Sequence, residues 1–159
     1  MIIVGVDPGT RVTGYGVIEV ANSTIRAKEY GIIKLNAKAP LQDRLNGIYD
    51  GLKEIFEKWN PDAVSVEEAF FAKNAQTALK LGHARGVILL AAYQQGSQIV
   101  EFTPRQIKKA VVGNGNADKS QVEFMVRTIL SLPSDPIKDD AFDALAAAIC
   151  ANNYSGFPR

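Results

Sequence analysis

Acidic side chains stand at three places in the chain where a strand is predicted to end or a helix to begin. Catalytic and binding sites on a sheet form at such places. In the last predicted helix, Asp143 follows Asp140 by three residues and Asp139 by four, so it shares a face with either of them. Spacing leaves that choice open. The candidate acids are Asp7, Glu67 or Glu68, and the group Asp139, Asp140 and Asp143.

Asp7 ends the hydrophobic run of residues 1–6, and its carboxylate needs a partner. A buried acid costs free energy unless it is paired, hydrogen-bonded or bound to a metal. No arginine or histidine pattern offers an obvious partner here. The acids of the last helix are less informative, because the helix dipole alone favours a charged first turn.

Several carboxylates brought together repel one another and retain protons unless hard cations neutralise them. Magnesium is the expected cation, because it takes oxygen ligands and shares its coordination shell with substrate phosphates. Two ions about 4 Å apart would stabilise both the attacking and the leaving oxygen of a phosphodiester. We therefore predict a site for two Mg²⁺ ions, in which Mn²⁺ could substitute.

The elements that carry these acids follow from hydrophobic periodicity and turn signals. Residues 1–6, 13–20 and 24–35 predict a three-stranded antiparallel meander, and residues 63–66 and 98–102 predict two parallel strands. Helices are predicted over residues 40–60, 74–93, 104–112 and 137–151, with a further helix from Asp118 or Ser120, where Ser120 and Glu123 fit a capping box. This order predicts an α/β fold of the ribonuclease H-like type, a five-stranded mixed sheet flanked by helices.

A chain of 159 residues has the length of one domain. We expect a single domain over residues 1–151 and a flexible C-terminal tail over residues 152–159. No apolar stretch approaches the roughly 20 residues that cross a bilayer, so we expect a soluble protein without an export signal. Cys150, the single cysteine, is predicted to be a buried thiol in a reducing compartment.

One segment of the chain is basic although the net charge is only +1. Between Thr103 and Arg127 the cations outnumber the acids, which indicates either contact with nucleic acid or an ordinary solvated face. Its cations are Arg105, Lys108, Lys109, Lys119 and Arg127.

Six stretches in the same order resemble the RuvC family of crossover-junction endonucleases, and the likeness covers nearly the whole chain. The first stretch alone also resembles the phosphate loop of actin-like kinases. The stretches are residues 5–16 (GVDPGTRVTGYG), 66–75 (VEEAFFAKNA), 78–86 (ALKLGHARG), 111–115 (VVGNG), 119–122 (KSQV) and 140–146 (DAFDALA).

The resemblance implies roles for particular residues. It selects Glu67 over Glu68, and it makes Asp7, Glu67, Asp140 and Asp143 the catalytic, metal-binding acids, with Asp139 a neighbouring surface acid. Phe70 matches an aromatic residue that stacks on an unpaired base, whereas Phe71 is expected in the core. Predicted DNA contacts are Phe70, Lys73, Lys80, Arg85, Arg105, Lys108 and Lys119.

The resemblance further implies a magnesium-dependent homodimer that resolves Holliday junctions by paired symmetric nicks in DNA recombination and repair. It implies cooperation with a RuvA–RuvB branch-migration complex and a cytoplasmic, nucleoid-associated location in a bacterium. The helix that carries Gly82 and Gly86 is our candidate for part of the dimer surface, although tight packing within the chain is the interpretation we favour for the glycines themselves.

Three alternatives remain. The first is a related nuclease of the YqgF type, and the second is half of a sugar or acetate kinase that uses residues 7–10 as a phosphate loop. The third is a junction-binding protein that has lost catalysis.

Overall fold

The computed structural model describes residues 1–68 and 74–154. Within them a mixed sheet runs in the order β3-β2-β1-β4-β5. Strands β1, β2 and β3 pair antiparallel, whereas β4 pairs parallel with β1 and with β5. This confirms the predicted meander with two added parallel strands. The strands are Ile2–Asp7 (β1), Val12–Ala21 (β2), Thr24–Lys34 (β3), Ala63–Glu67 (β4) and Gln98–Phe102 (β5).

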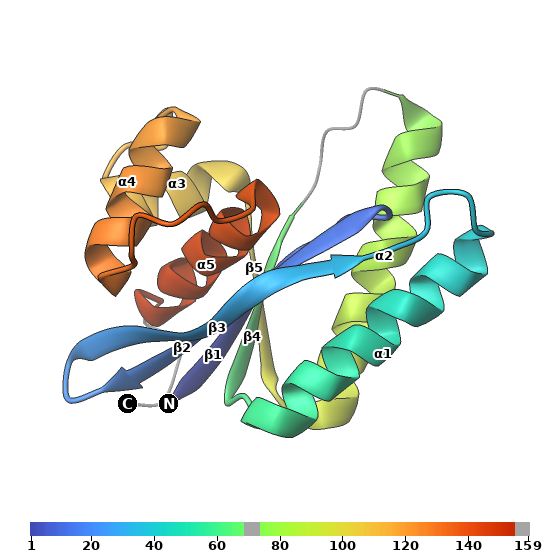
Figure 1. Ribbon diagram of the computed structural model, residues 1–159, viewed down its shortest axis with the longest axis horizontal. Coiled ribbons are helices and arrows are strands. Elements are labelled where there is room, and N and C mark those ends of the chain that lie inside the picture. Colours follow the sequence, from blue (N-terminus) through green and yellow to red (C-terminus); the bar gives the residue numbers. More distant parts are fainter. Residues whose placement is uncertain (69–73, 155–159) are drawn as a thin grey trace.

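Helices cover both faces of this sheet (Figure 1). Helices α1 and α2 lie on one face, and α3, α4 and α5 lie on the other. They span Leu41–Trp59 (α1), Ala75–Gln95 (α2), Pro104–Val112 (α3), Lys119–Leu130 (α4) and Asp139–Asn152 (α5). The ribonuclease H-like arrangement is therefore confirmed.

The sheet separates two hydrophobic cores, because alternate residues of a strand point to opposite faces. In β1, Ile3 belongs to the same core as Leu145 of α5, whereas Val4 belongs to the same core as Leu52 of α1. Each such fully buried aliphatic side chain contributes roughly 1.5–3 kcal/mol through apolar burial. Strand β1 supplies side chains to both cores, so it is packed from both sides.

Helix α4 begins at the first of its two predicted starts, but its capping box differs from the prediction. Asp118 is its N-cap and accepts the Gln121 backbone N–H at 2.9 Å, which completes a capping box with the Gln121 side chain. The predicted Ser120–Glu123 box is wrong, because Glu123 instead pairs with Arg127 one turn further along the helix. An aspartate two residues upstream is as good a cap as serine, so the local pattern did not separate them.

The chain after α5 is described as far as Tyr154. Asn152 is the last residue of α5, and the Tyr154 ring packs edge-on against Phe102 with centroids 5.7 Å apart. The flexible tail over residues 152–159 stays a prediction, and residues 155–159 lie outside the described residues. In the part of the chain that the structure describes, no helix is long and apolar enough to cross a membrane.

Candidate active site

Asp7 and Glu67 end two adjacent parallel strands at the same edge of the sheet. The register pairs Val6 of β1 with Val66 of β4, so each acid is the next residue on its strand. Both valines point into the core beneath α1 and α2. Because side chains alternate along a strand, Asp7 and Glu67 point to the opposite face, which α5 covers.

Helix α5 reaches this edge because glycines let it lie directly on the sheet backbone. Gly14 pairs with Asp7 across β1 and β2, and a methyl group at Gly14 would collide with the backbone carbonyl of Asp140. A methyl group at Gly5 would collide with the carbonyl of Ala144 in the same way. The buried Ser65 hydroxyl adds a hydrogen bond to the α5 backbone, at 2.8 Å from the Ala147 carbonyl. The helix start that carries Asp140 and Asp143 is thereby brought over the end of β1.

The four predicted acids interact electrostatically. Burial, followed by the charges of Glu67, Asp143 and Asp140, raises the pKa of Asp7 to about 8. Burial, followed by the charge of Asp143, raises the pKa of Glu67 to about 7. Burial likewise raises the pKa of Asp143, although Lys119 opposes the shift. The structure therefore brings together all four acids that the resemblance selected.

No hydrogen bond or ion pair to the Asp7 carboxylate is present among residues 1–68 and 74–154. A half-buried carboxylate beside other carboxylates and without a donor is poorly stabilised as an anion. The carboxylates of Glu67, Asp143 and Asp140 act on it, and their oxygens are the donor type that Mg²⁺ prefers. The donor chemistry thus fits a divalent cation.

Lys119 stands between two acids of α5. Its ammonium nitrogen lies 3.1 Å from Asp139 Oδ2 and 3.4 Å from Asp143 Oδ2. Partial burial opposes protonation, but the hydrogen bond with Asp139 and the charges of both acids raise the Lys119 pKa. Asp139, predicted to be a plain surface acid, therefore holds a lysine of the site, a contact that no local pattern could reveal.

A cavity of about 210 Å³ connects the acids to the basic segment. Its lining includes Glu67 and Asp143 together with Lys108 and Lys119. Lys108 belongs to α3 and Lys119 to the first turn of α4, so two helices that are separate in the sequence place cations beside the carboxylates. An acidic centre with flanking cations is suited to a phosphate group and hard metal ions.

The family model described as Crossover junction endodeoxyribonuclease RuvC matches residues 3–151. This chain belongs to the RuvC family. The family protein from Desulforamulus reducens is 49% identical over 155 residues, which are 98% of this chain and 95% of the relative.

Solved RuvC structures have the same fold. Thermus thermophilus RuvC superposes with a TM-score of 0.89 at 34% identity, covering 98% of this chain and 95% of that one. T. thermophilus RuvC in complex with its Holliday junction substrate gives 0.88 at 32% identity over the same shares of the two chains. Because these likenesses run along nearly the full length, they remove the support for the kinase and YqgF alternatives.

The other residues predicted to contact DNA differ in their exposure and in their partners. Arg105 is exposed on α3, and Lys80 is half-buried on α2. Arg85 is already engaged, since its Nε donates to Glu101 Oε2 at 2.5 Å and Glu68 lies within electrostatic reach. Phe70 and Lys73, together with Phe71, lie outside the described residues.

The acids of the site, as the structure describes them, do not form a complete set of metal ligands. In the part of the chain that the structure describes, no three His, Cys, Asp or Glu side chains are arranged to hold a metal ion. Like charges stay apart unless a cation draws them together, and Lys119 already occupies one side of Asp143. The donor chemistry of the site therefore suits a divalent cation, although the described side chains do not form a complete set of ligands.

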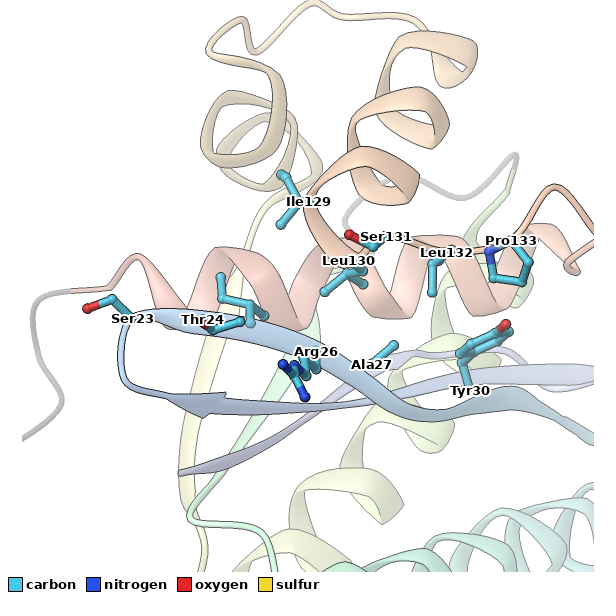
Figure 2. A pocket seen from close by; sticks show the side chains of 11 residues that line it. Ser23, Thr24, Arg26, Ala27, Tyr30, Ile129, Leu130, Ser131, Leu132 and Pro133 are labelled. Atoms are coloured by element: carbon cyan, nitrogen blue, oxygen red, sulfur yellow. The ribbon is translucent and has the colours of Figure 1, made fainter.

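A larger hollow of about 810 Å³ lies elsewhere, between the β2–β3 turn and the end of α4. Figure 2 shows Arg26 and Tyr30 on the strand side and Leu130 to Pro133 on the helix side. None of the acids of the site lines it. We therefore assign this hollow no part in catalysis, although it is larger than the cavity beside the acids.

Proposed function

We propose that this RuvC-family endonuclease resolves Holliday junctions by hydrolysing one phosphodiester in each of two strands, at the site formed by Asp7, Glu67, Asp140 and Asp143. The observation that carries this proposal is the cluster of acids: burial, followed by the charges of Glu67, Asp143 and Asp140, raises the pKa of Asp7 to about 8. Glu67 and Asp143 also line a cavity that two lysines share. A cluster that is so unfavourable for an apoprotein is explained by a need to bind cations.

The four acids would hold two Mg²⁺ ions, which Mn²⁺ could replace, and must draw together to do so. When bound, the ions supply electrostatic stabilisation of the attacking and leaving oxygens. Lys108 and Lys119 lie where they can neutralise charge on the scissile phosphate and position the strand. When the acids bind the ions, the ion pair between Lys119 and Asp143 would break, whereas the ion pair between Lys119 and Asp139 would remain and hold Lys119 at the site.

Lys108→Gln is expected to lower the rate of junction cleavage by about a hundredfold, because the variant loses one charge that faces the phosphate. Lys108 also lowers the Glu67 pKa, so the variant should need a higher pH for its maximal rate. Single-turnover cleavage measured between pH 6 and pH 9 checks both effects.

Lys109→Gln is the matched control for this experiment. Lys109 is the exposed neighbour on α3 and does not line the cavity. If the two variants cleave equally fast, the role assigned to Lys108 is wrong.

Homodimer formation is proposed through α2. Leu79 and Leu90 are 66% and 51% exposed, and together with Gly82 and Gly86 they line an apolar groove of about 860 Å³. A Cβ at either glycine would meet nothing within 4 Å among the described residues, so our interpretation of tight packing within the chain is wrong. An exposed apolar helix face is a typical self-association surface.

Leu79→Asp is expected to convert the dimer to a monomer, because a two-fold axis would bring the new charge into an apolar interface from both subunits. Sedimentation velocity at micromolar concentration measures this. Phe124→Asp on α4 is the control, since Phe124 is equally exposed at 67% but far from the groove. A Leu79→Asp protein that remains dimeric would place the interface elsewhere.

The other parts of the proposal follow family membership. The phosphate contacts of Lys80, Arg85 and Arg105 are proposed, with the smallest share for Arg85 because Glu101 competes for it. Cooperation with RuvA–RuvB, a cytoplasmic place near the bacterial chromosome, and a single nuclease domain over residues 1–151 are proposed likewise.

The test of the function uses a labelled synthetic four-way junction and a linear duplex of matching sequence. The purified protein is incubated with each DNA in Mg²⁺ and again in EDTA. We expect paired nicks only in the junction and only with Mg²⁺. Junction binding without cleavage would favour the alternative of a catalytically inert junction-binding protein.

A further inference from the structure

Helix α5 carries two acids of the proposed site, yet, like α1, it has no side chain that caps its N-terminus. Helices α2, α3 and α4 each have an N-cap side chain that accepts a backbone N–H of the first turn. Lys138, the N-cap of α5, makes no such hydrogen bond. An uncapped helix start frays unless other contacts hold it. Apart from its close approach to Gly14 and the contacts of Lys119, the turn that holds Asp140 therefore depends on the loop that precedes it.

The loop of residues 131–138, which leads into α5, is held by Arg127 near the end of α4. The Arg127 guanidinium donates to the backbone carbonyl of Pro133 through Nη1 and to that of Asp135 through Nη2, the latter at 3.1 Å. The Arg127 backbone carbonyl accepts the Leu132 N–H at 3.0 Å. Figure 2 shows Leu132 and Pro133 where this loop leaves α4.

The same guanidinium reaches α5 itself. Its central carbon lies 4.7 Å from the centre of the Phe142 ring, and Phe142 is only 3% exposed. Phe142 stands between Asp140 and Asp143 in the first turns of the helix. Arg127 thus fixes both the incoming loop and the helix turn, with a side chain that is itself only 22% exposed.

We propose that Arg127 is a positioning residue for the α5 acids: it holds residues 131–138 and Phe142 so that Asp140 and Asp143 face Asp7. The proposal rests on the function proposed above for these acids. A planar guanidinium is required, because only a fork of donors can bond two carbonyls while resting on a ring. Lysine at this position would keep the charge and lose that geometry.

The first test is hydrogen–deuterium exchange on the full-length protein in EDTA, which does not depend on cleavage. In Arg127→Met, exchange within residues 131–143 should become at least about tenfold faster, while β1 and β4 keep the wild-type rate. Arg127→Lys should show an intermediate effect and serves if the methionine variant does not fold. Glu123→Gln is the matched control, because it removes the Arg127 ion pair but leaves both carbonyl bonds.

The second test separates positioning from general stability. In Arg127→Met, the Mg²⁺ concentration for half-maximal cleavage should rise about tenfold, whereas the rate at saturating Mg²⁺ changes by less than about threefold. Junction affinity in EDTA should equal that of the wild type. Three results would each overturn the proposal. Residues 131–143 of Arg127→Met could exchange at the wild-type rate, or exchange could become uniformly faster across the whole sheet. The third is a Glu123→Gln variant with the same effect as Arg127→Met. A wild-type protein that does not cleave would instead refute the proposed function, and the exchange result would still decide the role of Arg127.

Discussion

Asp7→Asn is expected to abolish junction cleavage, by at least about a thousandfold, while it raises the melting temperature of the metal-free protein at pH 8. Asparagine keeps the side-chain volume and removes the charge that would bind cations, so catalysis is lost. Junction binding should persist, because it depends on phosphate contacts from basic residues. Cleavage assays and gel-shift titrations of purified wild type and variant measure the two effects.

The stability gain follows from the direction of the pKa shift. Burial, followed by the charges of the neighbouring acids, raises the pKa of Asp7 from the ordinary aspartate value of 3.8 to about 8, so the fold favours the protonated form. The stability linked to this proton is fully present below pH 4 and is lost as the pH rises through 8. Asparagine does not ionise, so the variant does not lose stability in this way as the pH rises. The variant should therefore match the wild type near pH 4 and melt roughly 5 °C higher at pH 8 in EDTA.

Thermal unfolding at several pH values checks this prediction. Glu54→Gln, which removes one exposed acid on α1, should leave both cleavage and the pH dependence unchanged. Mg²⁺ should stabilise the wild type at pH 8 more than Asp7→Asn, because a ligand stabilises only the protein that binds it. An Asp7→Asn protein with full nicking activity would refute the mechanism.

Gly14→Ala is expected to cause the second large effect, a loss of about 3 kcal/mol or more in the free energy of unfolding together with at least a hundredfold loss of cleavage. The new methyl group would collide with the Asp140 carbonyl, and a helix backbone cannot move away as a flexible side chain can. Helix α5 must shift, and Asp140 and Asp143 shift with it. Urea unfolding and junction cleavage measure the two losses.

Gly51→Ala is the matched control for Gly14→Ala. A methyl group at Gly51 in α1 would meet Cδ1, Cγ2 and Cγ1 of the Ile33 side chain, at 3.0, 3.1 and 3.2 Å. A small shift of this half-buried side chain relieves the contacts, and alanine favours the helix by about 1 kcal/mol over glycine. We expect near wild-type stability and activity. Equal losses in both variants would mean that the seating of α5 on Gly14 is unimportant.

Most elements of this fold could be predicted from local sequence patterns. The strands and helices over residues 1–112 begin and end within two residues of their predicted bounds, because alternation and helical periodicity repeat several times in each. Helix starts were harder. Helix α5 begins at Asp139 rather than Ile137, and α4 is capped by Asp118, because several residues there are acceptable caps.

The sequence alone also determined the type of chemistry: acids at the ends of two strands and at one helix start predict a site for hard cations, since strand ends of a parallel pair share one edge. Which acids face one another was decided only by the tertiary structure. Glycines at positions 5 and 14 let the α5 backbone contact the sheet backbone. Hydrophobic periodicity could not predict this contact, because glycine has no side chain and so adds nothing to the pattern. The contacts of Lys119 with Asp139 and of Arg85 with Glu101 were equally hidden. They join residues on different elements, and only the packing of those elements determines which charges meet.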